Sequence, residues 1–404
     1  MKKILQINIV VNYGSTGIIA EEIGRHAIEE GWESYIAFGR KERPSKSKLI
    51  KIGSDLDINL HVLQTRLFDR HGFGSHRATQ KLINQIEKIN PDIIHLHNLH
   101  GYYINIKILF DFLSKADIPI VWTLHDCWPI TGHCVHFDSI NCERWKTHCF
   151  NCPLKNSYPA SFLIDRSSKN HLFKKNKFTS IKRLTIVPVS NWLGNIIKKS
   201  FLNCYPIQVI NNGVDCNIFV QNKTQKIREK YNVIDKLIIL GVSNTWEPRK
   251  RLSDFIELSK SLDNSSVIIL VGLSSTQLKN LPKNIIGIPR TESVQELVDL
   301  YSAADIYLNL SIEETFGKTT AEALACGTPI IVYNATACPE LVSPETGFIV
   351  EKGNIISLLE SINIVRRAGR EHFAFACRER ALKLYNKNDR ISDYINLYKS
   401  MMNK

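Results

Sequence analysis

The chain has 404 residues, of which 44% are hydrophobic and 23% charged, and no long tract is strongly biased in composition. This excludes a disordered or fibrous protein, and the length fits two globular domains better than one. The 52 Lys and Arg residues exceed the 39 Asp and Glu residues and give a net charge of +13. Such a charge favours anionic partners such as nucleotides, nucleic acids or acidic lipid headgroups.

The N-terminal segment resembles a signal peptide, because Met1, Lys2 and Lys3 precede an apolar run. However, Gln6 and Asn8 interrupt that run, and no small-residue cleavage site follows. We therefore predict a first buried strand here. No apolar segment reaches the ~20 residues of a membrane-spanning helix, so we expect a cytoplasmic protein that is at most peripheral on the inner face of the membrane.

Apolar, β-branched runs alternate with helical patterns along the chain. In the first half, strands are predicted over residues 4–10, 34–38, 92–97, 118–124, 184–189 and 207–210, with helices at 16–30 and 77–89. In the second half, strands are predicted over residues 237–242, 267–271, 285–288, 306–310 and 330–333. Continuous apolar strands separated by helices indicate parallel sheets covered on both faces. The sequence therefore predicts two doubly wound, Rossmann-like α/β domains.

A polar stretch at residues 221–230 has the composition of a linker, and we place the domain boundary there. The first domain then covers residues 1–220 and the second residues 221–385. The end of the chain, from about residue 367, is predicted to be helical. Its last part, residues 386–404, can cross back to the first domain.

The longest basic stretch covers residues 166–183, which contain no acidic residue and interleave lysines with apolar side chains. A solvated helix face and a membrane-surface patch explain it equally well.

The first glycine-rich loop, residues 12–17, follows the first strand and leads into a helix. Gly14 and Gly17 would let the backbone approach an anion at the helix start. The loop lacks the spacing of a dinucleotide-binding motif, so a tight structural turn explains it as well as a ligand site does.

A stronger pattern lies between the predicted strand at residues 306–310 and the next strand at 330. Glu314 falls in the loop at the carboxyl end of the first strand, Gly317 opens a helix, and Glu322 lies within that helix. Ligands bind at this edge of open α/β sheets. Carboxylates suit sugar and ribose hydroxyls, and helix-start N–H groups suit a diphosphate.

This pattern resembles the Glu-x7-Glu segment of retaining glycosyltransferases of family 4, which have the GT-B fold of two Rossmann-like domains facing across a cleft. The resemblance extends to Asn211-Asn-Gly-Val-Asp215, the loop at 14–17, and the segments at 123–128 and 246–250. Together these segments are similar to the bacterial capsule and exopolysaccharide branch, which includes colanic-acid-type enzymes.

The resemblance implies a role for each matching residue. Glu314 would hold a donor sugar hydroxyl, Glu322 the nucleotide ribose, and Lys250 with Arg249 the leaving phosphate. His125, at the end of a strand in the first domain, would face the donor sugar. The diphosphate would bind the backbone of Phe316, Gly317, Lys318 and Thr319.

Two departures from the family pattern affect these assignments. Arg251 stands where the family usually has Gly, and Thr245 where it has Arg, so Arg249 would supply the missing cation. Lys318 stands where an apolar residue is common, and it could add a phosphate contact or alter the choice of sugar.

The resemblance implies a hexosyltransferase that moves a sugar from a UDP- or GDP-activated donor to a growing, lipid-linked surface polysaccharide. Transfer would retain the anomeric configuration, with the departing phosphate helping to deprotonate the acceptor. No catalytic metal is expected. The lone Asp-x-Asp at Asp55 and Asp57 is the mark of metal-dependent transferases of another fold and carries no weight here.

A cysteine cluster follows His125. The segment at about 127–152 is dense in cysteine and histidine, and a Cys-x2-Cys pair beside two more thiols can form a tetrahedral structural zinc site. The predicted ligands are Cys134, Cys142, Cys149 and Cys152. Free thiols in a compact loop are the alternative. As a structured insert, the segment would stand on the acceptor side of the first domain.

Other functions fit parts of the pattern. A sugar-nucleotide epimerase or hydrolase would bind the same donor but need acid and base groups instead of an acceptor site. A zinc-bearing nucleic-acid-binding protein would use the positive charge, yet aromatic residues are not regularly interleaved with basic ones. A non-catalytic subunit is disfavoured by the intact Glu314 and Glu322 pair. Donor, acceptor, linkage and oligomeric state do not follow from the sequence.

Overall fold

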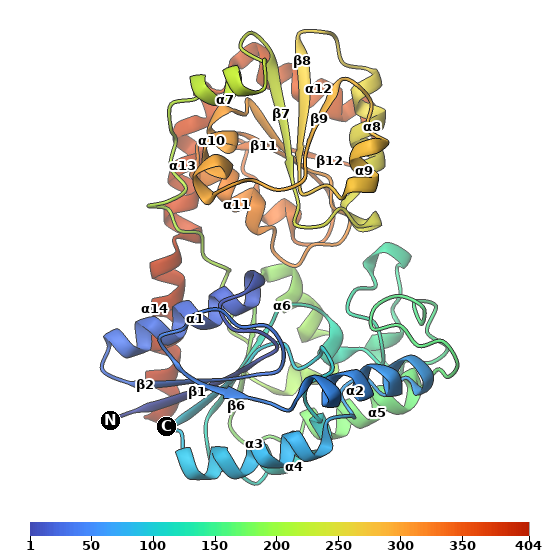
Figure 1. The fold of residues 1–404 in the computed structure, drawn as a ribbon, viewed down its shortest axis with the longest axis vertical. Coiled ribbons are helices and arrows are strands. Elements are labelled where there is room, and N and C mark those ends of the chain that lie inside the picture. Colours follow the sequence, from blue (N-terminus) through green and yellow to red (C-terminus); the bar gives the residue numbers. More distant parts are fainter. Residues whose placement is uncertain (404) are drawn as a thin grey trace. The chain divides into compact units, whose positions relative to one another are not determined.

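The computed structural model describes residues 1–403 and divides into two compact units. Unit 1 comprises residues 1–210 and 391–404, and unit 2 comprises residues 211–390. Each unit contains a parallel six-stranded sheet (Figure 1). The two predicted doubly wound α/β domains are therefore confirmed.

The sheet of unit 1 has the strand order β3-β2-β1-β4-β5-β6. Its strands are β1 (Lys3–Asn8), β2 (Glu33–Phe38), β3 (Lys48–Lys51), β4 (Ile93–Leu96), β5 (Ile120–Leu124) and β6 (Leu184–Pro188). Its helices are α1 (Gly14–Glu29), α2 (Asp55–Phe68), α3 (His76–Ile89), α4 (Ile106–Leu113), α5 (Ser167–Phe178), α6 (Asn191–Lys198) and most of α14 (Lys387–Met402). Because the strand order reverses beside β1 and right-handed crossovers are the rule, helices cover both faces of the sheet.

The last helix, α14, belongs to the core of unit 1. Its residues Ile391, Tyr394 and Tyr398 form one buried cluster with Ile4 of β1 and Ile23 of α1. The Tyr398 hydroxyl lies 2.6 Å from Nδ1 of His95 on β4. The chain end is therefore part of the fold of unit 1.

The sheet of unit 2 has the order β12-β11-β10-β7-β8-β9. Its strands are β7 (Leu237–Val242), β8 (Ser266–Val271), β9 (Ile285–Ile288), β10 (Ile306–Asn309), β11 (Ile330–Tyr333) and β12 (Gly347–Val350). Its helices are α7 (Gln225–Lys230), α8 (Leu252–Lys260), α9 (Ser275–Lys279), α10 (Val294–Ala303), α11 (Lys318–Ala325), α12 (Ile355–Ala368) and α13 (Glu371–Tyr385).

The predicted strand at residues 207–210 is wrong. This segment makes a single bridge, between Ile207 and Ile186 of β6. Ile186 donates to the carbonyl of Pro206 and accepts from Gln208, and Ile210 donates to the carbonyl of Pro188, but the hydrogen bond between these two steps is missing. Pro188, which would donate next, has no N–H.

The division between the units lies ten residues before the boundary placed from the sequence. The segment after Asn211 is bound to α13, because Arg378 donates to the carbonyls of Cys216 and Phe219. The N–H of Val214 donates to the carbonyl of Tyr385. These hydrogen bonds place residues 211–220 in unit 2.

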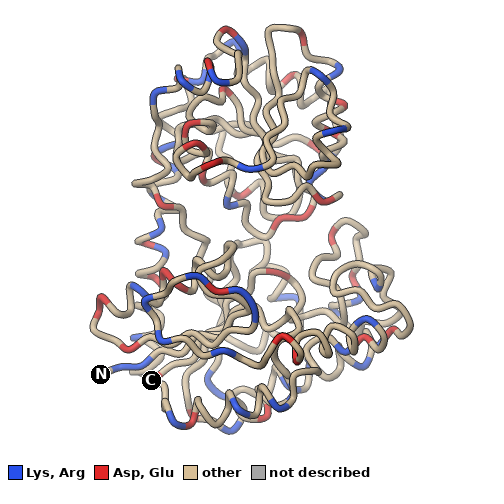
Figure 2. Tube along the Cα trace, in the orientation of Figure 1, with Lys and Arg blue, Asp and Glu red and all other residues tan. Residues whose placement is uncertain are grey.

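Lys and Arg residues and Asp and Glu residues are distributed over both units (Figure 2). Among residues 1–403, no helix has both the length and the hydropathy of a membrane-spanning segment.

Candidate functional site

The order of strands in unit 2 reverses between β7 and β10, which are neighbours in the sheet although three crossovers separate them in the chain. Loops that leave two such strands diverge to opposite faces and open a crevice at their carboxyl ends. Lys250 lies in the loop after β7, and Glu314 lies in the loop after β10. Two of the predicted site residues thus flank the switch point of this sheet.

Lys250 and Glu314 form an ion pair between these two loops. Their side chains are 17% and 18% exposed, so the pair is largely buried but reaches solvent. The backbone of Glu314 is fixed as well, since its N–H donates to Oγ1 of Thr336 over 2.9 Å. The ammonium and the carboxylate are therefore held close together by their loops.

Arg249 holds the same loops together. Its guanidinium donates to the carbonyl of Glu313 over 3.0 Å and to the Glu247 carboxylate over 2.8 Å. Its own carbonyl accepts from Ile312 over 2.9 Å. The cation adds positive charge beside Lys250, but its hydrogen bonds are to the loops.

Helix α11 begins at Lys318, directly after Gly317. Gly317 has φ 93°, a left-handed conformation that glycine adopts without strain. The first N–H groups of a helix have no partner within it and carry partial positive charge. The predicted backbone segment from Phe316 to Thr319 therefore forms the N-terminus of a helix at the carboxyl edge of the sheet, where anions bind.

Glu322 lies one turn into α11 and is 7% exposed. The Tyr301 hydroxyl donates to its Oε2 over 3.0 Å. Burial raises the pKa of Glu322, while the Lys318 charge and the Tyr301 hydrogen bond oppose that shift. Tyr301 thus holds this carboxyl group, and the sequence pattern did not identify this partner.

In unit 1 the strand order reverses between β1 and β4. Gly14 and Gly17 lie in the first turn of α1, which follows β1. A Cβ atom on Gly17 would meet Cγ2 of Val10 at 3.0 Å and the N–H of Asn12 at 3.2 Å. Gly17 therefore allows the start of α1 to pack tightly on the chain that leaves β1.

His125 follows β5 and ends a chain of hydrogen bonds. The Gln6 amide donates to the carbonyl of Ala20 over 2.7 Å, so its Oε1 faces His97 and accepts from Nε2 of His97 over 3.1 Å. Nδ1 of His97 is then the acceptor, and Nε2 of His125, 3.2 Å away, is the donor. This assigns Nδ1 of His125 as its acceptor nitrogen.

Burial lowers the pKa of His125 to about 4, although the nearby Asp126 carboxylate acts in the opposite direction. The imidazole is therefore neutral near pH 7. Burial also lowers the pKa of His97 well below its usual value. The pair can polarise a hydroxyl group without carrying a full charge.

Asp126 follows His125 and forms an ion pair with His100, at 2.6 Å between Oδ2 and Nε2. Nδ1 of His100 lies 3.1 Å from the Tyr158 hydroxyl. His97, His100, His125 and Asp126 line one pocket of unit 1. Asp126 was not among the predicted site residues, although it lies directly after His125 at the end of β5, where site residues are expected.

The four predicted zinc ligands line one small cavity of the insert. Among the described residues, no three His, Cys, Asp or Glu side chains are placed to hold a metal ion, and the zinc site stays a prediction. The thiols have other partners. Cys134 and Cys152 are hydrogen-bonded to each other, and Cys149 accepts from the N–H of Gly132.

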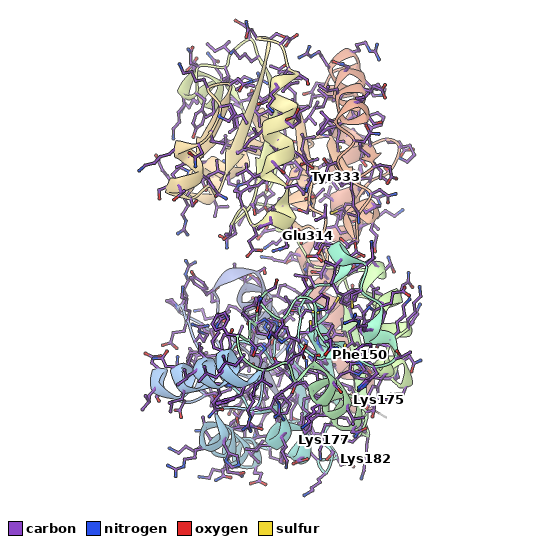
Figure 3. The ribbon with its side chains drawn as sticks, turned by 90° about the vertical axis from the view of Figure 1, so that its right-hand side faces the viewer. Phe150, Lys175, Lys177, Lys182, Glu314 and Tyr333 are labelled. Carbon is purple, nitrogen blue, oxygen red and sulfur yellow. The ribbon has the colours of Figure 1, made fainter. Side chains whose placement is uncertain are left out.

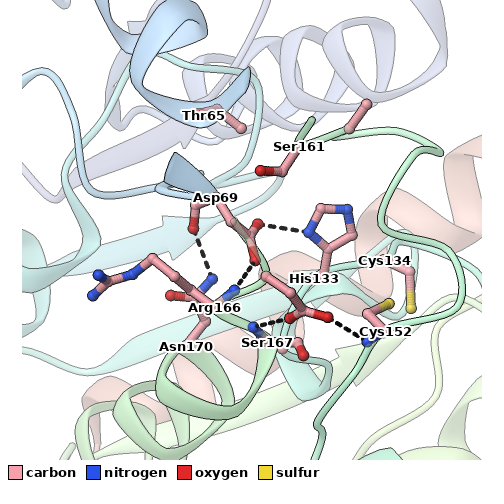
Figure 4. Close-up of polar contacts among 12 residues, drawn as sticks. Thr65, Asp69, His133, Cys134, Cys152, Ser161, Arg166, Ser167 and Asn170 are labelled. Carbon is pink, nitrogen blue, oxygen red and sulfur yellow. Dashed lines mark hydrogen bonds and ion pairs between the residues drawn. The ribbon is translucent and has the colours of Figure 1, made fainter. Parts of the chain in front are cut away.

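The insert is anchored by buried polar contacts (Figure 4). The fully buried Asp69 pairs with His133 at 2.6 Å and accepts from the N–H of Arg166 at 2.8 Å. Its carbonyl accepts from Asn170 at 2.9 Å. These hydrogen bonds tie the cysteine-rich insert to the segment after α2 and to the start of α5.

The basic stretch at residues 166–183 is not a continuous charged face. Lys174 is 1% exposed and donates to the carbonyls of Trp128 and Thr131. Lys177 pairs with Asp111, whereas Lys175 and Lys182 point into solvent (Figure 3). Part of this stretch is therefore packed into the fold, and part of it is solvated.

Two family models match the chain. Residues 16–218 match the model of Glycosyltransferase Family 4. Residues 223–375 match the model of Glycosyl transferases group 1. The first match covers most of unit 1 and extends over residues 211–218 of unit 2, and the second match lies within unit 2.

Similar proteins cover nearly the whole chain. A colanic acid biosynthesis glycosyl transferase of Escherichia coli K12, WcaC, is 24% identical over 98% of this chain and 100% of its own length. Sucrose-phosphate synthase of Thermosynechococcus elongatus has a TM-score of 0.73 at 14% identity and covers 99% of both chains. Anabaena HepE, in complex with UDP, has a TM-score of 0.70 at 14% identity over 99% of this chain and 100% of its own. These structures show that the fold is the expected GT-B fold.

Proposed function

The chain belongs to glycosyltransferase family 4, and from this premise we propose that it moves a sugar from a nucleotide-sugar donor to a growing, lipid-linked surface glycan, with retention of anomeric configuration. The similarity to a colanic acid transferase supports the choice of a surface polysaccharide. The protein would act from the cytoplasmic side as a peripheral enzyme.

The observation that carries this proposal is the arrangement at the switch point of unit 2. One ammonium, one carboxylate and one helix N-terminus meet there, with a second carboxylate buried in the same helix. A nucleoside diphosphate sugar has matching parts: a diphosphate for the cation and the helix N–H groups, and two sets of hydroxyls for the carboxylates. HepE, which shares the fold, binds UDP.

Each residue then has a specific task. The N-terminus of α11 and Lys250 bind the diphosphate, which competes with Glu314 for the ammonium. Glu314 thereby becomes free to accept a hydrogen bond from a donor sugar hydroxyl. Glu322, fixed by Tyr301, accepts from the ribose hydroxyls.

The proposed reaction breaks the bond between the anomeric carbon and the leaving phosphate oxygen. The acceptor oxygen forms its bond to that carbon on the same face, and its proton passes to the departing phosphate. Lys250 stabilises the charge that develops on this phosphate, where electrostatic stabilisation has its largest effect. His125 contributes the contact of unit 1 with the transferred sugar through its neutral imidazole.

The proposal is tested first by calorimetry with UDP, GDP, ADP and their sugars against the wild type and Glu322→Gln. We expect one nucleotide to bind and to raise the melting temperature, and the variant to lose this effect. Glu360→Gln, an exposed substitution on α12, is the matched control and should bind like the wild type.

A second measurement addresses the reaction itself. Turnover of the binding nucleotide-sugar with a lipid-linked acceptor should give a product whose anomeric configuration, read by NMR, equals that of the donor. Inversion would refute the proposed mechanism. Donor turnover that is as fast without acceptor would favour the hydrolase alternative.

A further inference from the structure

Helix α2 lies on the outside of unit 1 (Figure 1) and presents an apolar stripe to solvent. Its buried residues are Ile58, His61 and Thr65, two of which are polar. An amphipathic helix normally turns its apolar side toward the core, so the orientation of α2 is the reverse of the usual one. The outward stripe consists of Leu56, which is 68% exposed, Leu60 at 51%, Leu63 at 53%, and the half-buried Leu67.

Hydrogen bonds on the inner side fix this orientation of α2. His61 is 1% exposed, and its Nε2 accepts from the N–H groups of Gly72 and Gly74 over 3.1 and 3.2 Å. Its Nδ1 lies 3.0 Å from the Ser75 hydroxyl. Turning the leucines inward would break these contacts and leave buried polar groups unpaired. The stripe therefore stays exposed unless another molecule covers it.

A second apolar segment continues the stripe at the end of α2. Phe162, Leu163 and Ile164, which follow the cysteine-rich insert, are 60%, 66% and 42% exposed. The N–H of Phe162 donates to the carbonyl of Arg66 over 2.7 Å, and the Arg66 guanidinium lies 5.5 Å from the centre of the Phe162 ring. We call the four leucines and these three residues the α2 surface. Large exposed apolar surfaces on a soluble protein mark interaction sites.

The spacing of the leucines indicates what covers them. From Leu56 to Leu67 the intervals are four, three and four residues. This is the spacing of the a and d positions along which two helices pack in a coiled coil. Ile58 and Thr65 take the opposite f positions, and they are the residues that face the fold of unit 1. The stripe thus suits a helix with the same spacing, which a second copy of α2 provides.

Two copies of α2 match best when they run antiparallel. In a pair related by a two-fold axis through the middle of the stripe, Leu60 meets Leu63 of the second copy, and Leu56 meets Leu67 of the second copy. Every leucine then packs on a leucine, and the same surface is used by both copies.

The charges beside the stripe favour this arrangement. Asp55 and Asp57 lie in the first turn of α2, and Arg66 lies in its last turn. In the antiparallel pair the acidic end of each helix lies beside the basic end of the other, whereas a parallel pair brings like charges together. The same acidic end argues against a membrane, because helices that bind anionic lipid carry Lys and Arg beside their apolar face.

We propose that the protein forms a two-fold symmetric dimer in which the α2 surfaces of two copies pack on each other with their helices antiparallel. A standard interface buries about 800 Å² of each partner, more than four leucines supply, so residues 162–164 form its outer part. The inference goes beyond the proposed glycosyl transfer and does not depend on it.

Sedimentation velocity of the full-length protein over a wide range of concentrations tests the dimer. We expect the wild type to be a dimer that dissociates on dilution. Leu60→Glu/Leu63→Glu brings carboxylates together at the centre of the seam and should weaken dimerisation about 100-fold or more. Ile356→Glu is the matched control, since Ile356 is 72% exposed on helix α12 of unit 2, and this variant should dimerise like the wild type.

Folding is checked separately. Because both leucines are exposed in the single chain, the double variant should keep the circular dichroism spectrum of the wild type and its melting temperature in dilute solution.

A charge exchange tests the antiparallel pairing. Asp55→Arg places two basic groups together at each end of the seam and should weaken dimerisation about threefold to tenfold. Asp55→Arg/Arg66→Asp should restore it, because opposite charges again lie side by side. A double variant that dimerises as weakly as Asp55→Arg would overturn the antiparallel pairing.

The other occupants of the α2 surface give different results. A wild type that is monomeric at every concentration, or a dimer that Leu60→Glu/Leu63→Glu leaves intact, overturns the inference. Flotation with vesicles of phosphatidylcholine and phosphatidylglycerol examines the membrane. If the wild type is monomeric and binds these vesicles while the double variant does not, the α2 surface faces lipid and the dimer is refuted.

Discussion

Units 1 and 2 have sheets of the same size with the same kind of strand-order reversal, yet their sites are built from different chemistry. Twelve of the thirteen histidines lie before the division at Ile210, and His372 is the other one. Unit 2 places a Lys–Glu ion pair and a helix N-terminus at its switch point. Unit 1 places neutral imidazoles and aromatic rings there. The same fold thus presents charged groups at the edge of one sheet and neutral imidazoles at the edge of the other, and the residues at that edge, not the fold, determine function.

The largest effect should follow from removing the cation of unit 2. Lys250→Ala leaves the developing phosphate charge unneutralised, and we expect kcat for transfer to fall by about 10²- to 10³-fold. Steady-state kinetics with the nucleotide-sugar that binds measures this. Lys226→Ala on α7, an exposed lysine of the same unit, is the control and should be unaffected.

Wild-type activity in Lys250→Ala would show that unit 2 does not act through this charge. The contrast drawn between the units would then lose its main support. An intermediate loss, deepened by adding Arg249→Ala, would instead divide the role between the two cations.

In unit 1, His125→Ala should lower kcat by about 10²-fold, the usual contribution of a positioned proton-transfer or polar group. His97→Ala should lower it less, since His97 acts by fixing the tautomer of His125 through the 3.2 Å contact. Nucleotide affinity, measured by calorimetry, should stay at the wild-type value in both variants. A loss of nucleotide affinity in His125→Ala would break the assignment of charge recognition to unit 2 alone.

The sequence predicted which residues lie at the carboxyl edge of each sheet better than it predicted their contacts with residues from other elements. The pattern around Glu314 and Glu322 placed both carboxylates correctly in a loop and a helix, because an apolar strand followed by Gly317 constrains local structure strongly. Tyr301, which binds Glu322, comes from a different helix, and no local pattern could connect them.

The aromatic rings packed around His71 show the same limit more clearly. With His71, they come from four segments spread over residues 71–158, and each residue alone is unremarkable in the sequence. Only the fold shows that the Tyr102 hydroxyl and Nδ1 of His71 are both buried and without a hydrogen-bond partner. The spacing of the cysteines predicted that they lie close together, but not the hydrogen bond between Cys134 and Cys152 or the contact of Cys149 with the N–H of Gly132.

Lowering the pH should destabilise unit 1 more than unit 2. Burial lowers the pKa of His61 and His125 to about 4, against about 6.5 in the unfolded chain. The unfolded state therefore binds more protons between these values, so stability is complete above about pH 6.5 and falls as the pH decreases toward 4. Each such histidine costs unit 1 on the order of 2–3 kcal/mol at pH 4.

Tryptophan fluorescence can follow the unfolding of unit 1 at each pH, since five of the six tryptophans lie in unit 1 and Trp246 lies in unit 2. In Trp246→Phe the signal reports unit 1 alone. We expect its urea midpoint to fall between pH 7 and pH 5, while the circular dichroism transition of unit 2 moves little. Equal shifts in both transitions would contradict the contrast.

The smallest expected effect concerns the last helix. In Tyr398→Phe, His95 loses the partner that lies 2.6 Å from its Nδ1, and a buried nitrogen is left unpaired. This should cost unit 1 about 1–3 kcal/mol. The Tyr231 hydroxyl donates to Glu296 near the surface of unit 2. Tyr231→Phe should therefore lower the free energy of unfolding by less, and it should shift the unfolding transition of unit 2. If both variants shift the fluorescence midpoint of Trp246→Phe protein equally, α14 does not stabilise unit 1 selectively. If only Tyr398→Phe does so, the end of the chain is shown to be a structural part of the unit that carries the histidines.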